Sequence, residues 1–208
     1  MSVITQNKFE SVIQKISDVK SDFALNPAII LTEDDLKCLI FHRLYELFDH
    51  SEETMNSTIK GSPLHSELKF FDENGKLFLR PDITILDPKK LSILHSICDT
   101  VIVNNSLRYK APSSKGFEFG YNCIVIELKY YRSKSGIGKR ELNTINKDLM
   151  KIRRLKNIAE SYNNRSKIYG IMVVFNKSNK YVDEFQELFV SERADEIKII
   201  YGTGNLEF

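Results

Sequence analysis

The run CIVIELKYY, residues 123–131, constrains the fold more than any other stretch of this 208-residue chain. It opens with the apolar triplet Ile-Val-Ile (124–126), which is typical of a strand buried on both faces. It then places Glu127 and Lys129 where further apolar residues would be expected. Because side chains alternate along a strand, both of these project from the same face. We therefore expect a central strand whose end carries an acid and a base side by side.

Two helices are predicted before the first strand. Apolar residues at helical spacing predict an amphipathic helix over residues 5–22. Thr32 is a good N-cap for a second helix that continues to about residue 49, and acids fill its first turn, where the helix dipole favours them.

A β-hairpin is expected next. Residues 64–71 alternate in polarity, the sequence DENG (72–75) predicts a tight turn, and residues 76–86 form the return strand. Arg80-Pro81-Asp82 lies inside that return strand. Because proline cannot donate to a ladder, Pro81 marks an edge, a bulge or a local irregularity.

The rest of the chain alternates between helices and strands. We expect a short helix at 91–98, a short strand at 101–103, a loop at 111–120 and a basic loop at 132–139. Beyond it we expect a helix at 140–162, a buried strand at 168–175, a helix at 182–190 and a strand at 197–201. This order predicts an α/β fold with a mixed central sheet flanked by helices.

Composition suits one globular domain, because 42% of the residues are hydrophobic in a chain of this length. The three cysteines, Cys38, Cys98 and Cys123, have no zinc-type spacing and indicate free thiols in a reducing compartment. The N-terminal stretch lacks the apolar region of a signal peptide, and no run of 18 or more apolar residues exists. We therefore expect a cytoplasmic protein without a membrane segment.

Positive charge is concentrated after the opening strand. Residues 129–167 contain 12 Lys or Arg and 3 Asp or Glu, a balance of +9, whereas the whole chain carries +2. Such a block is the electrostatic footprint of a protein that binds a phosphate backbone. The alternative is a solvated helix face.

Asp82 is the third member of the candidate site. If the strand that contains it neighbours residues 123–131, Asp82, Glu127 and Lys129 meet at one end of the sheet. Two close acids repel and need a cation between them, and oxygen ligands without a His/Cys set favour Mg²⁺. The alternatives are an exposed Glu127–Lys129 pair and an Asp82 carboxylate paired with Arg80.

The motifs Pro81-Asp82 and Glu127-Leu128-Lys129 resemble those of the PD-(D/E)xK nuclease superfamily, which has the restriction-endonuclease-like fold. The resemblance implies an α-β-β-β-α-β core in a single nuclease-like domain (1–208). Residues 1–30 would be an N-terminal helical extension, and residues 88–120 an insertion between core strands. It implies that Asp82, Glu127 and the Leu128 carbonyl bind Mg²⁺ (or Mn²⁺), and that Lys129 orients the attacking water.

Further site residues follow from the resemblance, from the strand pattern and from the basic charge near the motifs. An acid on the first core helix would be Glu33, with Glu46 as the weaker match, although Glu33 could serve only the helix dipole. On the predicted strand 64–71, His65 and Glu67 are either extra metal or substrate contacts or an ordinary exposed face. The helix after the third strand offers Lys147, Asp148 and Lys151. The candidate nucleic-acid contacts are Lys134, Lys139, Arg140, Lys147, Lys151 and Arg154.

The expected function is a metal-dependent endonuclease that hydrolyses phosphodiester bonds, with DNA as the expected substrate. The alternative is a non-catalytic module that binds nucleic acid or protein on the same fold. Cleavage of both DNA strands would usually need two active sites, so a homodimer is a further expectation.

Overall fold

The computed structural model describes the following residues: 4–56, 58–71, 76–93, 99–103, 106–110, 117–119, 122–162, 167–191 and 197–206. The helices are α1 (Gln6–Leu25), α2 (Glu33–Tyr45), α3 (Lys139–Tyr162) and α4 (Asp183–Ser191), with short 3-10 helices at Pro27–Ile29 and Pro88–Lys90. The strands before the basic segment are β1 (Glu52–Glu53), β2 (Lys60–Gly61), β3 (Leu64–Ser66), β4 (Phe70–Phe71), β5 (Leu77–Leu79), β6 (Ile83–Leu86), β7 (Leu91–Ile93), β8 (Asp99–Val103), β9 (Ser106–Lys110) and β10 (Phe117–Phe119). The later strands are β11 (Cys123–Tyr131), β12 (Ile168–Asn176) and β13 (Ile197–Thr203).

A mixed sheet of five strands forms the centre, in the order β13-β12-β11-β6-β3. β11, β12 and β13 run parallel to one another, whereas β6 is antiparallel to both β11 and β3. The prediction of a mixed sheet flanked by helices is confirmed. β11 is buried along its first six residues because β6 and β12 cover its two edges and helices cover its two faces.

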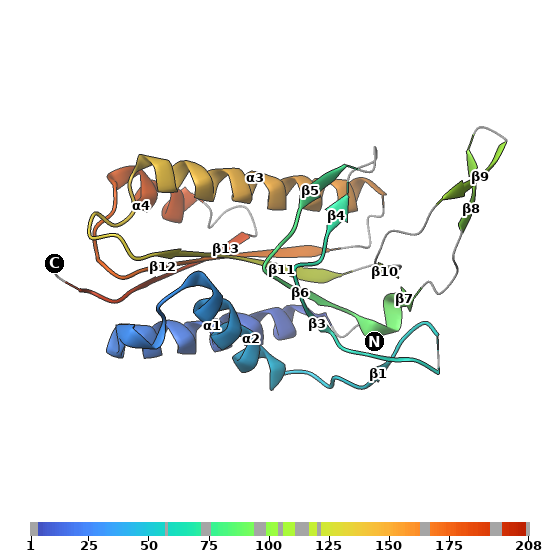
Figure 1. Ribbon diagram of the computed structural model, residues 1–208, viewed down its shortest axis with the longest axis horizontal. Coiled ribbons are helices and arrows are strands. Elements are labelled where there is room, and N and C mark those ends of the chain that lie inside the picture. Colours follow the sequence, from blue (N-terminus) through green and yellow to red (C-terminus); the bar gives the residue numbers. More distant parts are fainter. Residues whose placement is uncertain are drawn as a thin grey trace.

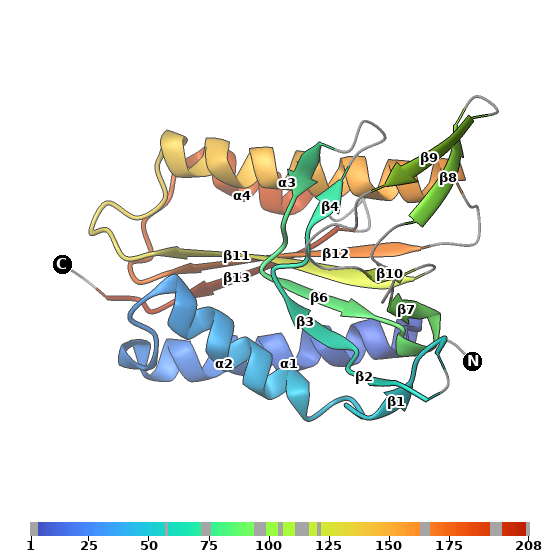
Figure 2. The same ribbon diagram turned by 45° about the vertical axis from the view of Figure 1, so that its right-hand side comes forward.

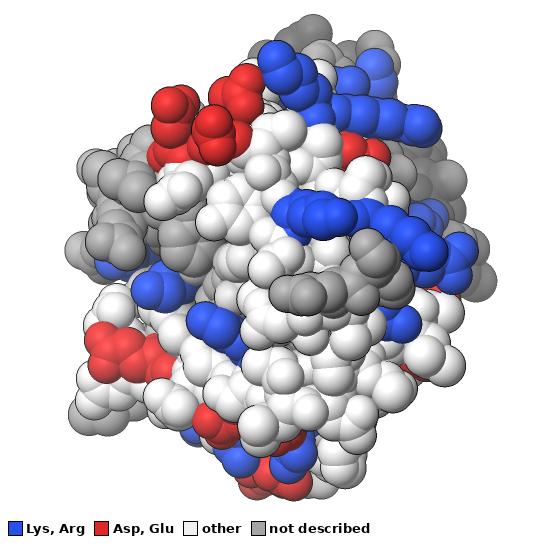
Figure 3. Space-filling view, turned by 90° about the vertical axis from the view of Figure 1, so that its left-hand side faces the viewer, with Lys and Arg blue, Asp and Glu red and all other residues white. Residues whose placement is uncertain are grey.

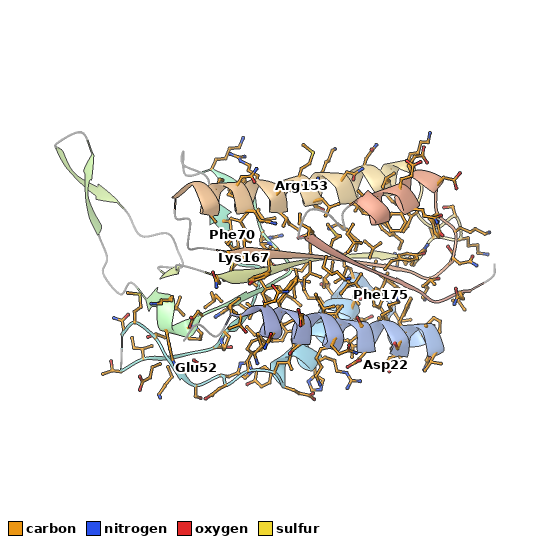
Figure 4. The ribbon with its side chains drawn as sticks, turned by 180° about the vertical axis from the view of Figure 1, so that it is seen from behind. Asp22, Glu52, Phe70, Arg153, Lys167 and Phe175 are labelled. Atoms are coloured by element: carbon orange, nitrogen blue, oxygen red, sulfur yellow. The ribbon has the colours of Figure 1, made fainter. Side chains whose placement is uncertain are left out.

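Helices cover both faces of the sheet: α1 and α2 lie on one side, and α3 and α4 on the other (Figures 1 and 2). Each side has its own apolar core. Phe175 of β12 lies on the α1 side, with its ring centre 5.0 Å from that of Phe23 (Figure 4). The residues predicted as an N-terminal extension belong to this core, because α1 buries one whole stripe of its surface there.

The helix starts follow from local chemistry. Thr32 caps α2 as predicted: its side chain accepts a hydrogen bond from the Asp35 backbone N–H, and the Asp35 carboxylate accepts one from the Thr32 N–H. This reciprocal pair satisfies two N–H groups that have no partner inside the helix. It fixes the position of Glu33 in the first turn of α2.

The predicted hairpin differs from expectation because both of its strands break. β3 ends before Glu67, whose φ of +54° lies in the left-handed region, and the return strand is interrupted at residues 80–82. Pro81 accounts for the second break because it has no N–H to donate. The β4–β5 pair then leaves the sheet and packs against α3, where Arg154 lies 4.9 Å from the centre of the Phe78 ring. The predicted turn at 72–75 lies outside the described residues.

The predicted insertion, 88–120, contains two further antiparallel pairs, β7–β10 and β8–β9. The predicted helix at 91–98 is wrong at its start, because residues 91–93 form a strand; residues 94–98 lie outside the described part. The predicted loop at 111–120 likewise includes a strand at residues 117–119. Short apolar runs do not separate helix from strand by period alone, and here the pairing partner decides. In Figures 1 and 2 the β8–β9 pair lies apart from the sheet.

Cys38 is exposed and Cys123 is buried, both as free thiols, and Cys98 lies outside the described residues. Among the helices of the described residues, none has the length and apolar character needed to cross a bilayer.

We expect Gly170→Ala to lower the melting temperature. A Cβ at this position would lie 2.7 Å from Cγ2 of Ile152 on α3 and 3.1 Å from Cγ1 of Ile197. Overpacking of this kind costs about 1–3 kcal/mol. The matched control is Gly138→Ala, where the nearest atom is Oε2 of Glu141 at 3.0 Å, the end of a flexible side chain that can shift. Equal melting temperatures of Gly170→Ala and the parent would contradict the close approach of α3 to β12.

Candidate active site

The candidate site forms where β11 loses one of its two neighbours. β6 pairs with β11 only from Cys123–Leu86 to Ile126–Ile83, whereas β12 follows β11 as far as Tyr131. Among the described residues, the second half of β11 therefore has one edge without a strand partner. Exposed backbone N–H groups at such an edge require other acceptors.

Two carboxylates accept hydrogen bonds from the N–H groups of that edge. The Leu128 N–H donates to Oδ2 of Asp82 at 2.8 Å, and the Tyr130 N–H donates to Oε2 of Glu33 at 3.2 Å. Because the N–H and C=O of one strand residue face the same edge, the Leu128 carbonyl also points to the side where Asp82 lies. Asp82, directly before β6, and Glu33 of α2 thus meet beside the residue between Glu127 and Lys129.

The side chains of Glu127 and Lys129 share one face, as the strand alternation predicts. Nζ of Lys129 lies 2.8 Å from Oε1 of Glu127 and 3.0 Å from Oδ2 of Asp148 on α3. Glu127 is 9% exposed and Asp148 is 7% exposed. The alternative of a solvent-exposed ion pair is therefore wrong, because Glu127 is buried and the side chain of Lys129 is only 14% exposed.

Burial raises the pKa of Glu127 to about 7, and the attraction of Lys129 offsets this only in part. Its second oxygen, Oε2, is buried and has no hydrogen-bond partner within the described residues. Burial also raises the pKa of Asp82 above its usual value, and the Leu128 N–H counteracts this. Two carboxyl groups that resist ionisation therefore stand at one strand end, which is typical of functional sites.

Lys129 is an ammonium group in this setting. Burial alone would lower its pKa, but the carboxylates of Glu127 and Asp148 outweigh burial and raise it above the usual value. For Asp148 burial acts to raise the pKa, and the Lys151 and Lys129 ammonium groups bring it below its ordinary value. Lys129 can donate hydrogen bonds and stabilise negative charge, but it does not take up a proton near neutral pH.

Glu67 lies beside the site but is engaged with cations. Its carboxylate accepts a hydrogen bond from Nζ of Lys37 at 3.0 Å and lies 3.7 Å from Nη1 of Arg80, while its N–H donates to the Asp82 carbonyl. Arg80 thus pairs with Glu67, not with Asp82 as the alternative supposed. His65 is half-buried, and Nε2 donates to the Ser62 carbonyl.

Glu46, the weaker match for a helix acid, pairs with Lys15 of α1 at 3.1 Å. The structure therefore favours Glu33 over Glu46 as the acid nearest to β11.

The predicted nucleic-acid contacts lie on α3 and on the loop before it. Lys134, Arg140 and Lys147 are exposed, and Lys139 is exposed with Glu184 3.5 Å away. Lys151 is half-exposed and bonds Asp148. Figure 3 looks toward the end of the molecule where β11 ends, and Lys and Arg gather at the upper right of that face.

Asp148 is the site residue whose role the sequence reveals least. It is one of three candidates on its helix, although it alone lies on the apolar stripe with Ile145, Leu149 and Ile152. An acid on a buried stripe needs a charged partner. That periodicity argument could have selected Asp148 over Lys147, which is exposed.

The residues fit a hard divalent cation. In the described residues, no group of three or more His, Cys, Asp or Glu is arranged to hold a metal. Mg²⁺, however, is usually held by one or two carboxylates, with water and substrate oxygens completing the shell. Asp82, Glu127 and the Leu128 carbonyl supply only oxygen ligands. Oε2 of Glu127, which has no hydrogen-bond partner in the described part of the chain, is available to bind a cation.

Comparisons of the chain with protein-family models, with curated proteins and with solved structures found no match. Membership of the nuclease superfamily therefore remains a prediction from the residues and their geometry.

We expect Glu127→Gln to melt higher than the parent at pH 8 without metal, by a few degrees. In the folded state the pKa of Glu127 is about 7, against an ordinary value of 4.5. Folding therefore binds a proton between these pH values, so the charged group costs stability above pH 7 and this cost fades as the pH falls toward 4.5. Thermal unfolding in a chelator at pH 5 and pH 8 measures the difference. Glu10→Gln on the exposed face of α1 is the control. An equal difference in melting temperature between Glu127→Gln and the parent at both pH values would refute the raised pKa of Glu127.

Proposed function

We propose that this protein is a Mg²⁺-dependent nuclease that hydrolyses phosphodiester bonds in DNA, as an endonuclease. The observation that carries the proposal is the hydrogen bond from the Leu128 N–H to Asp82. It brings the acid of the Pro81-Asp82 motif to the middle of the Glu127-Leu128-Lys129 motif, across 46 residues of sequence. Neither motif alone is specific for a nuclease, but their proximity at one strand end supports a shared site.

The order of elements supports the same proposal. α2, β3, β6, β11, α3 and β12 occur along the chain in the order α-β-β-β-α-β, with the short strands β1 and β2 between α2 and β3 and the β4–β5 pair between β3 and β6. This is the order that the resemblance to the superfamily implies, with β7 to β10 inserted before the third core strand. The proposal therefore includes the restriction-endonuclease-like fold for this domain.

Asp82 and Glu127 would hold the cation together with the Leu128 carbonyl, and Glu33 stands close enough to influence it. When bound, a divalent cation neutralises charge on the phosphoryl group and lowers the pKa of a water. Mn²⁺ would serve as well, because it takes the same oxygen ligands.

Lys129 would orient the attacking water and stabilise its deprotonated form. As an ammonium group it donates hydrogen bonds, so the proton of the water leaves to solvent and not to Lys129. Attack at phosphorus forms one P–O bond and breaks another, and the leaving oxygen takes up a proton. Buried charges of this kind act strongly because little water screens them.

The basic segment supplies a reason for a polyanion to be present. Arg140 and Lys147 of α3 and Lys134 of the preceding loop are exposed on the chain segment that follows β11 directly. Contacts of this class position a backbone and carry no sequence information by themselves. The proposal therefore concerns the backbone of the nucleic acid and includes no preferred base sequence.

We expect the purified protein to cleave plasmid DNA with Mg²⁺ or Mn²⁺, and Asp82→Asn, Glu127→Gln and Lys129→Met to lose at least ~100-fold in rate. Both amide variants retain an oxygen acceptor of the same size, so the side-chain amide of Asp82→Asn can still accept the Leu128 N–H. Gel analysis of linear, circular and single-stranded DNA and of RNA measures the rate.

The controls for this assay are Glu10→Gln and Lys198→Met, at exposed positions on α1 and β13. Absence of cleavage by the parent protein on every substrate would overturn the enzymatic proposal. Metal-independent binding of DNA in that case would favour the non-catalytic module instead.

We expect Mg²⁺ or Mn²⁺ to raise the melting temperature by about 5–10 °C at 100 times the dissociation constant, because a ligand that binds only the folded state stabilises it. Asp82→Asn and Glu127→Gln should remove most of this shift, and Lys198→Met should retain it. Differential scanning calorimetry at pH 7.5 makes the measurement. If neither cation changes the melting temperature of the parent protein, the protein has no metal site of the proposed kind.

A further inference from the structure

Lys129 is shared between two carboxylates that come from different elements. Its Nζ lies 2.8 Å from Oε1 of Glu127, two residues along the same strand, and 3.0 Å from Oδ2 of Asp148 on α3. The side chains of all three residues are 14% exposed or less. Such an arrangement gives one ammonium group two alternative places to bond.

This sharing creates a conflict with metal binding. A cation between Asp82 and Glu127 would bind the Glu127 carboxylate, whose negative charge Lys129 neutralises in the metal-free protein. Two positive charges close to the same buried carboxylate also repel each other strongly, because the surroundings screen them poorly. Even with the cation on Oε2 of Glu127 and Lys129 on Oε1, this repulsion would weaken the bond between Lys129 and Glu127.

We propose that Asp148 is a positioning residue that receives the Lys129 ammonium group when a divalent cation binds Glu127. This inference rests on the proposed function, because it assumes the cation site of the nuclease. It assigns to α3 a part in metal affinity through Lys129, without making Asp148 a ligand of the cation. By bonding the Lys129 ammonium group, Asp148 would also hold Lys129 in the position from which it orients the water.

The surroundings of Asp148 suit this role. The carboxylate is buried on the apolar stripe of α3, between Ile145 and Ile152, and its Oδ1 accepts from Lys151 at 2.6 Å. It is therefore fixed in position and charged before any metal arrives. Lys129 is already at hydrogen-bond distance from it, so the transfer requires no large movement.

The charges around the site add a second argument. The carboxyl groups that interact electrostatically with the Lys129 ammonium group are those of Asp82, Glu127, Glu33 and Asp148, and Asp148 also interacts with Lys151. Lys37 also acts on Asp82 and lowers its pKa. Once ionised, these carboxylates outnumber the ammonium groups near them, and a divalent cation would reduce that excess of negative charge. Without Asp148, Lys129 would stay on Glu127, because an unpaired buried ammonium group is costly.

The test is the affinity of the full chain for Mn²⁺ alone, measured by isothermal titration calorimetry without nucleic acid. We expect Asp148→Asn to bind Mn²⁺ about tenfold more weakly, since a hydrogen bond between charged groups contributes in this range. In the Lys129→Met background the competitor is absent, so Asp148→Asn should change the affinity at most about twofold. Lys198→Met, at an exposed position on β13 away from these residues, is the control, and its affinity for Mn²⁺ should equal that of the parent.

Each result decides between the proposals. Unchanged affinity of Asp148→Asn, or an equal loss in the Lys129→Met background, would overturn the role of Asp148 and leave the nuclease proposal standing. A parent protein that binds no Mn²⁺ would overturn both. A cooperative thermal unfolding transition without metal shows that each variant is folded. If Asp148→Asn does not fold, Asp148→Ser replaces it in the test.

Discussion

The divergence of β6 from β11 after the pair Ile126–Ile83 is the constraint on which the candidate site depends. Where β6 departs, β11 continues and its N–H groups need acceptors in a partly buried place. Carboxylates from the residue before β6 and from α2 supply them. The same backbone requirement that completes the sheet therefore draws Asp82 and Glu33 to the strand end that carries Glu127 and Lys129.

This arrangement costs the fold some stability. Glu127 is buried with one oxygen that has no partner in the described part of the chain, and burial opposes its ionisation. An apolar residue at this position would continue the buried run of β11 without that cost. Functional sites commonly break such local rules, and the rest of the structure offsets the cost. Here the two apolar cores on either side of the sheet do so.

Periodicity predicted the long elements well, because their burial is regular. The helices α1, α2 and α3 and the strands β11 and β12 begin and end within a few residues of expectation. The hairpin and the insertion were harder for a physical reason. Local pattern does not reveal that Glu67 adopts a left-handed conformation, or that residues 91–93 find a partner in β10. Both depend on contacts between distant segments.

The sequence by itself determined that Glu127 and Lys129 leave one face of a buried strand, because alternation is a property of the extended backbone. It also determined the cap of α2 and the basic character of the segment after β11. Only the tertiary structure decided which acids join them. Asp82 arrives because β6 pairs with β11 in one register, and Asp148 arrives because α3 packs its apolar stripe on that face. Register and packing are set by the whole core, so no short motif could specify them.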